Sequence, residues 1–192
     1  MIKPSIPSTL EAALQEEQLV AEIRHNPAAF VELYDRYLAP VYRYLISRVG
    51  DPQDAEDLTS QVFLTALERF PQYQNQGKPF AAWLFTIARN KSIDFFRARR
   101  IEDPLTSFHF SKDQKDPLSE VMQKDESQII LDIIAMYTPQ DREVLQLRFA
   151  AEMTYAEIAH LLQRNEDAVK KQIYRLLERI GKDLEDKNGQ PA

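Results

Sequence analysis

The sequence contains no cysteine and only four glycines among its 192 residues. The absence of cysteine excludes disulfides, thiolate zinc sites and cysteine nucleophiles. The glycines lie too far apart to form a phosphate-binding G-x-G-x-x-G turn or a P-loop. Since sandwiches and barrels of β-strands need many glycine-rich turns, the composition favours an all-α protein.

The chain also lacks the histidine pattern of a metal site and any long apolar run. Its three histidines, His25, His109 and His160, are scattered and form no H-E-x-x-H motif. No run approaches the roughly 18 apolar residues of a membrane span, and residues 1–18 lack the apolar core of a secretory signal. We therefore expect a soluble, cytoplasmic, helical protein with no metal, no cofactor and no membrane insertion.

The net charge of −6 is distributed unevenly along the chain. Basic residues outnumber acidic ones by six to one over 78–100 and by six to three over 164–182, whereas 101–128 holds seven acidic residues and three lysines. A single charged run is usually a solvated face. Two basic segments, one rich in aromatic residues and one with a helix-turn-helix pattern, instead favour contact with nucleic acid.

Apolar periodicity and capping signals predict the first helices. An apolar stripe over 30–45 predicts an amphipathic helix, which Pro40 should kink or split and Gly50 should end. Asp51 and Pro52 supply the N-cap and the first position of the next helix.

The predicted helices form two domains separated by a linker. The prolines, charges and weak periodicity of the segment after residue 100 predict a flexible connection. The predicted organisation is an N-terminal extension at 1–25, a domain at 26–100, an acidic linker at 101–128, a domain at 129–186 and a tail at 187–192.

A helix-turn-helix pattern occupies about residues 154–181. Thr154 and Glu157 fit a capping box at its start, and Asn165 can cap its second helix. That helix would present a basic face able to contact phosphates and guanine edges in a major groove. The alternative is an ordinary helical hairpin with solvated lysines. The outward residues of the second helix are Lys170, Lys171, Tyr174 and Arg175.

Aromatic residues and cations alternate around the first basic segment. Tyr73, Phe80 and Trp83 lie close in sequence to Lys78 and Lys91. Such a mixture suits single-stranded nucleic acid, because bases stack on the rings and the cations neutralise phosphates. The alternative is that the rings are core residues, which the helical spacing favours for Phe80 and leaves open for Trp83.

The acidic start of the second helix, at 51–57, needs a separate explanation. Its paired carboxylates have no histidine partner and no second ligand cluster, so a metal or catalytic site is disfavoured. A protein-docking face or a plain helix cap fits these residues better.

Five ordered segments resemble the sigma-70 family of bacterial transcription initiation factors, specifically its small extracytoplasmic-function (ECF) subgroup. They are FVELYDRYLAPVYRYL, GDPQDAEDLTSQVF, WLFTIARNKSIDFFR, TPQDREVLQLRF, and the pair MTYAEIAHLL and VKKQIYRLLERI. The resemblance covers about residues 26–186. It implies a sigma-2-like helical bundle and a sigma-4-like helix-turn-helix domain. It also implies a non-enzymatic subunit that binds core RNA polymerase, recognises −35 and −10 promoter elements and helps to melt the −10 region.

The resemblance assigns three sets of site residues. Core-polymerase binding falls to Asp54, Glu56, Asp57, Leu58 and Gln61. Recognition and melting of the −10 element fall to Tyr73, Lys78, Phe80, Trp83, Asn90, Lys91, Asp94, Arg97 and Arg100. Contact with the −35 element falls to Thr154, Tyr155, Asn165, Lys170, Lys171, Tyr174 and Arg175.

The implied partners are the β′ clamp helices and β flap of core polymerase, double-stranded −35 DNA, single-stranded −10 DNA and an anti-sigma factor. The sequence departs from the family pattern at the helix-turn-helix turn, where Gln163 and Arg164 replace the usual glycine and apolar residue. Either Gln163 adopts a left-handed conformation at some cost, or the turn differs from that of the family. The competing interpretation is a stand-alone helix-turn-helix regulator with an N-terminal partner-binding domain.

Overall fold

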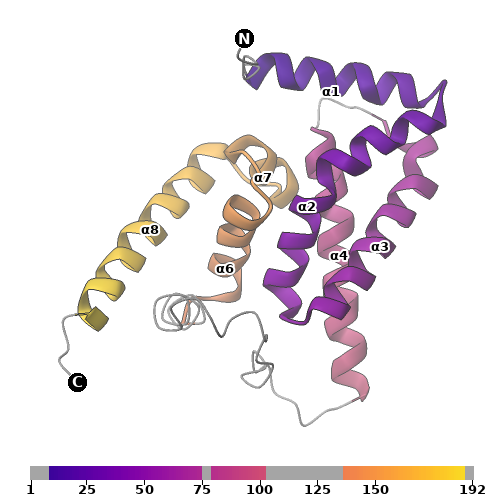
Figure 1. Ribbon diagram of the computed structural model, residues 1–192. Coiled ribbons are helices and arrows are strands. Elements are labelled where there is room, and N and C mark those ends of the chain that lie inside the picture. Colours follow the sequence, from indigo (N-terminus) through magenta and orange to yellow (C-terminus); the bar gives the residue numbers. More distant parts are fainter. Residues whose placement is uncertain (1–8, 75–78, 103–135, 189–192) are drawn as a thin grey trace, which may run out of the picture.

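The computed structural model describes residues 9–74, 79–102 and 136–188, and every regular element in these ranges is helical. The N-terminal part comprises α1 (Thr9–Ile23), η1 (Pro27–Ala29), α2 (Phe30–Val49), α3 (Pro52–Arg69), η2 (Phe70–Gln72) and α4 (Phe80–Glu102). The C-terminal part comprises α6 (Pro139–Leu145), η4 (Gln146–Ala150), α7 (Tyr155–Leu162) and α8 (Glu166–Asn188). Figure 1 shows α2, α3 and α4 as a bundle, with α1 across one end and the C-terminal helices along one side. The all-α prediction is confirmed, while the predicted linker lies almost entirely outside the described residues.

The N-terminal bundle forms around the apolar stripe of α2. Leu33, Val41 and Leu45 on that stripe have no exposed surface. The helix runs unbroken through Pro40, so of the kink and the split expected there, the split does not occur. Proline removes one backbone hydrogen bond. Burial of apolar side chains on both sides of Pro40 keeps the two turns in one helix, because tertiary packing supplies most helical stability.

The junction between α2 and α3 follows its local sequence signals. Gly50 ends α2 in a left-handed conformation with φ of 77°, which glycine adopts without a Cβ penalty. An Oδ1 atom of Asp51 accepts a hydrogen bond from the backbone N–H of Asp54 at 2.9 Å, and Pro52 is the first residue of α3. Both predictions for this turn are confirmed.

The C-terminal helices α7 and α8 also carry the predicted caps. Thr154 and Glu157 form a reciprocal capping box at the start of α7. Gln163 ends α7 with φ of 54° and ψ of 46°. It thus adopts the left-handed conformation of this turn, where the family usually has a glycine. The side chain of Asn165 accepts hydrogen bonds from the backbone N–H groups of Asp167 and Ala168, at 2.9 and 3.3 Å.

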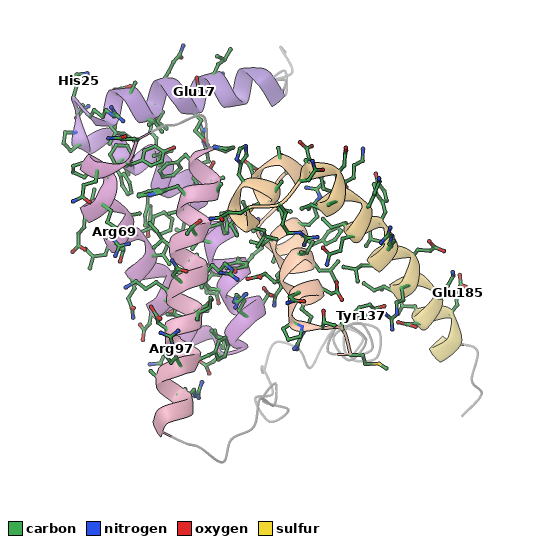
Figure 2. All side chains as sticks on the ribbon, turned by 180° about the vertical axis from the view of Figure 1, so that it is seen from behind. Glu17, His25, Arg69, Arg97, Tyr137 and Glu185 are labelled. Carbon is green, nitrogen blue, oxygen red and sulfur yellow. The ribbon has the colours of Figure 1, made fainter. Side chains whose placement is uncertain are left out.

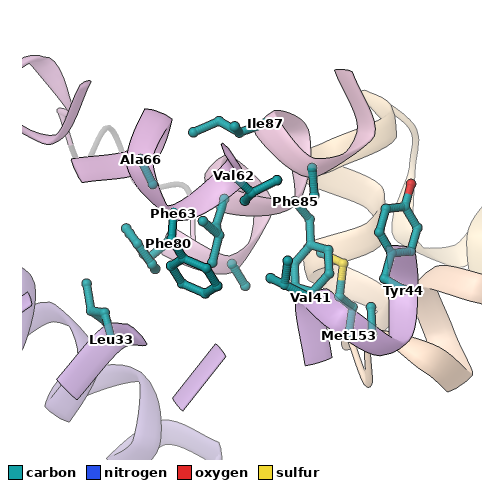
Figure 3. Close-up of a cluster of buried hydrophobic side chains, with 14 of the residues drawn as sticks. Leu33, Val41, Tyr44, Val62, Phe63, Ala66, Phe80, Phe85, Ile87 and Met153 are labelled. Carbon is teal, nitrogen blue, oxygen red and sulfur yellow. The ribbon is translucent and has the colours of Figure 1, made fainter. Parts of the chain in front are cut away.

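The two groups of helices share one hydrophobic core. Buried residues of α2, α3 and α4 belong to the same cluster as Leu147, Met153 and Ile158 from the C-terminal part. Figure 3 shows Met153 among Val41, Tyr44 and Phe85. The bundle and the C-terminal domain therefore form one packed body.

Candidate nucleic-acid interface

The acidic start of α3 presents only part of its predicted docking set. Glu56, Asp57 and Gln61 are exposed. Asp54 is instead paired with Arg99 of α4, with 3.2 Å between the carboxylate and guanidinium groups. Leu58 is 5% exposed and lies in the core. The surface that this set offers to a partner is therefore the exposed trio, in which Asp57 and Gln61 share one helix face.

Tyr73, Phe80 and Trp83 form a compact group that we call the aromatic corner. Its ring centroids lie 4.8 Å apart for Tyr73–Trp83, 5.4 Å for Phe80–Trp83 and 5.6 Å for Tyr73–Phe80. Tyr73 and Phe80 are only 5% and 2% exposed, and burial raises the pKa of Tyr73 to about 12. Trp83 is half-buried. Of the three rings, Trp83 is thus the one whose surface is available for stacking.

The polar residues predicted for −10 DNA line one side of α4. Asn90, Asp94 and Arg97 are exposed, and Lys91 is half-buried. Arg97 and Asp94 are loosely paired at 3.6 Å. Lys78 and the side chain of Arg100 lie outside the described residues.

A shallow hollow of about 430 Å³ accompanies this face of α4. It adds Arg69, from the C-terminal end of α3, to the predicted cations, and Figure 2 shows Arg69 and Arg97 on these two helices. Sequence reasoning missed Arg69 because only packing of α3 against α4 brings it near. The lining residues are Thr65, Arg69, Ile87, Asn90, Lys91, Ile93, Asp94 and Arg97.

The outward face of α8 carries the predicted cations. Lys170, Lys171, Tyr174 and Arg175 are all exposed, while Val169 and Ile173 are fully buried on the opposite side. Exposure at this spacing leaves a basic strip along the second helix of the helix-turn-helix.

The other residues predicted for the −35 contact cap helices or pack against neighbouring side chains within the domain. The side chains of Thr154 and Asn165 cap α7 and α8. Tyr155 is partly buried, with the guanidinium of Arg148 5.0 Å from its ring centroid. Gln172 donates to Asp141 at 2.6 Å and accepts from Arg164 at 2.7 Å, so its amide ties α8 to α6.

One cation of the first basic segment forms an ion pair within the protein and is not free to bind a partner. Arg89 of α4 donates to Glu143 of α6 at 2.7 Å, and this hydrogen bond raises the pKa of Arg89. Arg48 of α2 approaches the same carboxylate at 3.3 Å. Arg43 and Gln146 add contacts to backbone carbonyls across the same boundary, at 3.1 and 2.6 Å. We call Glu143, Arg48 and Arg89 the interdomain triad.

Within residues 9–74, 79–102 and 136–188, no group of three or more His, Asp or Glu side chains is arranged to hold a metal ion. In the same ranges no helix is long and apolar enough to cross a membrane.

Two family regions match the chain, one after the other along the sequence. The chain matches Sigma-70 region 2 over residues 33–101 and Sigma-70 region 4 over residues 127–180. These two matches contain the α4 face and the α8 strip, respectively.

Curated relatives include two ECF RNA polymerase sigma factors. BldN of Streptomyces coelicolor is 37% identical over 161 residues, which cover 82% of this chain and 61% of BldN. The chain therefore spans less than two thirds of BldN. SigM of Bacillus subtilis is 30% identical over 154 residues, which cover 78% of this chain and 91% of SigM.

Solved structures agree in fold. CnrH, in complex with the cytosolic domain of CnrY, has a TM-score of 0.63 at 23% identity, covering 89% of this chain and 97% of that one. RpoE of Bartonella quintana, in complex with the anti-sigma factor NepR, has a TM-score of 0.64 at 22% identity, covering 81% and 96%. With both sigma regions present in order and ECF relatives at 30% identity or more, the chain belongs to the ECF subgroup of the sigma-70 family of RNA polymerase sigma factors.

Proposed function

We propose that this chain binds core RNA polymerase in the cytoplasm and directs promoter-specific initiation, without catalysing a reaction itself. The observation that carries the proposal is the presence of two exposed cationic faces, on α4 and α8, within the two matched sigma regions. The exposed trio on α3, which carries two carboxylates and an amide, complements them as a surface for a protein partner.

The polymerase contact is assigned to Glu56, Asp57 and Gln61 of α3. The negative charge of Glu56 and Asp57 favours a basic protein surface over DNA, since phosphates would be repelled. The proposed partner surface for these residues is the clamp-helix region of the β′ subunit. The C-terminal domain is proposed to bind the β flap.

The −10 contact is assigned to the aromatic corner and the polar face of α4. Extruding a base from a duplex costs a few kcal/mol. Stacking of a base on an aromatic ring returns about 1–3 kcal/mol, and Trp83 offers such a surface. Lys91, Arg97 and Arg69 lie where they would neutralise the phosphates of the separated strand. Melting is therefore driven by binding, with no hydrolysis by this chain.

The −35 contact is assigned to the basic strip of α8. The second helix of a helix-turn-helix enters the major groove, where Lys and Arg contact phosphates or guanine. Lys170, Lys171, Tyr174 and Arg175 are exposed for this purpose. Asn165 caps α8, which carries the strip, and Thr154 and Tyr155 form the start of α7, the first helix of the pair.

An anti-sigma factor is a further proposed partner. The solved relative RpoE of Bartonella quintana is described in complex with the anti-sigma factor NepR. A protein that holds this chain away from polymerase would compete with polymerase for the exposed trio on α3.

Reconstitution tests the proposed function directly. Core polymerase is mixed with the full chain and a pool of templates with randomised upstream sequence, and run-off transcripts are selected and sequenced. We expect transcripts that depend on the chain and share two upstream sequence blocks. Transcription independent of the chain would refute the proposal. Tight, specific DNA binding without polymerase would instead support the stand-alone regulator.

A further inference from the structure

The turn that joins α7 to α8 has an arginine at its centre. Arg164 lies between the left-handed Gln163 and Asn165, whose side chain caps α8. The backbone N–H of Arg164 donates to the carbonyl of Ala159 in α7 at 2.9 Å, as in a Schellman turn. Because the backbone is fixed on both sides of Arg164, its side chain leaves the turn from a defined position.

A series of hydrogen bonds holds the Arg164 side chain against α8. Nη1 of Arg164 donates to Oε1 of Gln172 at 2.7 Å, and Nε2 of Gln172 donates to Oδ1 of Asp141 at 2.6 Å. The other carboxylate oxygen of Asp141 accepts from the hydroxyl of Thr138 at 2.8 Å. Asp141 belongs to α6, so the series runs from α6 through α8 to the turn.

The chemistry of these side chains fixes the orientation of the Gln172 amide. A guanidinium only donates hydrogen bonds and a carboxylate only accepts them, so the amide oxygen faces Arg164 and the amide nitrogen faces Asp141. Gln172 and Asp141 are half-buried, whereas Arg164 is exposed. The bond to Gln172 engages one N–H donor of the guanidinium and leaves others for an acceptor outside the protein.

Gln172 places this guanidinium at one edge of the basic strip of α8. Residues three positions apart lie on the same side of a helix, so Gln172 and Arg175 are neighbours. Lys170, two residues before Gln172, lies across the strip from it. Arg164 therefore adds a cation beside Arg175, at the edge of the strip and not at its centre.

The first turn of α8 carries negative charge. Glu166 and Asp167 are exposed there, and Lys170 of the strip follows about one turn later. In a helix-turn-helix, the N-terminal residues of the second helix are the ones that contact the DNA bases. Carboxylates at this end repel phosphates. The guanidinium of Arg164 supplies positive charge within the same part of the helix and offsets that repulsion.

The width of a major groove favours a phosphate over a base as the partner of Arg164. The groove is about 12 Å wide, and a helix with its side chains is about 10–12 Å across. Residues at the edge of the inserted face therefore meet the walls of the groove, which are lined with phosphates. A guanidinium matches a phosphate well, because it can donate parallel N–H bonds to two of the phosphate oxygens.

We propose that Arg164 binds a backbone phosphate of double-stranded −35 DNA and that Gln172 is its positioning residue. Gln172 holds the guanidinium at the edge of the strip, Asp141 fixes Gln172, and neither of these two touches DNA. The inference rests on the proposed −35 contact. It extends that contact to a residue of the turn, where the sequence departs from the family pattern.

The test uses holoenzyme assembled from core polymerase and the full chain. The probe is a fluorescent duplex carrying the −35 sequence block found in the template selection, titrated at several salt concentrations. Arg164→Ala should weaken binding about threefold to tenfold at low salt. The slope of log affinity against log salt concentration should fall by about 0.9, the value for one phosphate contact. A duplex of scrambled sequence should lose a similar factor, because a phosphate contact carries no sequence information.

A double-mutant cycle tests the positioning role of Gln172. Gln172→Ala leaves the net charge unchanged but releases the guanidinium, and it should weaken binding about twofold to fivefold. In the Arg164→Ala background the same substitution should cause no further loss, since Gln172 acts through Arg164. Additive losses would overturn the positioning role, because Gln172 would then act on DNA independently.

Two further variants separate a phosphate contact from a change in net charge. Lys182→Ala removes an exposed cation from the same helix, about two turns beyond Arg175, where it pairs with Glu178 at 2.9 Å. It should leave affinity and salt slope at the wild-type values. Arg164→Lys keeps the charge and should recover most of the salt slope. Since Arg164 is exposed, Arg164→Ala should unfold within a few degrees of wild type, which circular dichroism verifies.

Binding, salt slope and transcription together discriminate between the contact at Arg164 and the proposed function. Equal affinity and slope for Arg164→Ala and Lys182→Ala would overturn the phosphate contact, while transcription by the wild-type chain still upheld the proposed function. A loss confined to the selected −35 sequence, with an unchanged slope, would also overturn it. An equal loss of affinity for core polymerase would do the same, because the effect would then be general. A wild-type chain that supports no transcription with core polymerase would remove both proposals.

Discussion

Replacing Glu143 by alanine should loosen the contact between the bundle and the C-terminal domain. The side chains of Glu143 and Arg48 are only 13% and 15% exposed, and the carboxylate accepts from Arg48 and Arg89 together. Its removal leaves two cations without their acceptor, and Arg48 Nε already has no hydrogen-bond partner among the described residues. Breaking a fully buried pair costs about 3–5 kcal/mol.

The expected loss for Glu143→Ala is smaller than that range. Arg89 is 36% exposed and can regain water when the carboxylate is gone, so we expect about 2–3 kcal/mol of destabilisation. The assay is equilibrium unfolding in urea at pH 7, together with amide hydrogen exchange in the second half of α2 and in α6. Exchange should accelerate in both segments, since they face each other across the interdomain triad.

Glu178→Ala is the matched control for this measurement. Glu178 pairs with Lys182 at 2.9 Å on the exposed surface of α8, and its loss should leave the unfolding midpoint unchanged. Equal effects of Glu143→Ala and Glu178→Ala on unfolding, with unchanged exchange in α2 and α6, would refute the argument that the triad joins the domains.

If Arg175 contacts a base, Arg175→Ala should weaken binding of holoenzyme to a −35 duplex by about 1–3 kcal/mol; if it contacts a phosphate, the substitution should reduce the salt dependence of binding by about one contact. Filter binding at a series of salt concentrations distinguishes the two, and an affinity and a salt dependence equal to those of wild type would contradict both. Gly50→Ala should destabilise the bundle by about 1 kcal/mol, because the added Cβ meets no neighbour but the φ of 77° is strained for alanine. Thermal unfolding that matches wild type would show that this strain is absent. Burial raises the pKa of Glu16, so the folded protein holds this proton to higher pH than the unfolded chain does. The stabilisation from protonated Glu16 is complete below the pKa of 4.5 in the unfolded chain and disappears as the pH rises through the higher pKa of the folded protein. The free energy of unfolding of wild type, minus that of Glu16→Gln, should therefore fall over that pH interval. A difference that does not change with pH would contradict the raised pKa.

Local sequence signals predicted the helix boundaries well. Gly50, Asp51, Thr154 and Asn165 occupy the turns and caps expected of them, because each acts on backbone groups within three residues. Of the two alternatives left open at Gln163, the structure has the left-handed conformation. At Pro40 the sequence left a kink and a split open, and the helix stays continuous because of packing against α3 and α4.

Long-range contacts limited what the sequence revealed about the candidate site. Periodicity favoured a core position for Phe80, but it did not show that Tyr73 is also buried or that Trp83 stays half-exposed. The pairing of Arg89 with Glu143, 54 residues away, removes a cation that the charge pattern counted toward DNA. The contact of Arg24 with the backbone carbonyl of Tyr73, 49 residues away, likewise forms only in the folded bundle. The assignment of individual residues to polymerase and promoter stays a prediction.

The shared core of the two domains has a geometric consequence for a promoter. A compact chain of this length has a radius of gyration of about 16 Å, and thus a diameter of roughly 40 Å. Elements centred at −35 and −10 are about 85 Å apart along B-form DNA. The 33 residues at 103–135 can span at most about 120 Å when fully extended, which exceeds that distance. One molecule can therefore occupy both elements only after α6 and η4 have separated from α2 and α4. Because that separation costs free energy, the chain should have a lower apparent affinity for DNA that carries both elements. Its affinity for DNA that carries only one of the elements should not be lowered in this way.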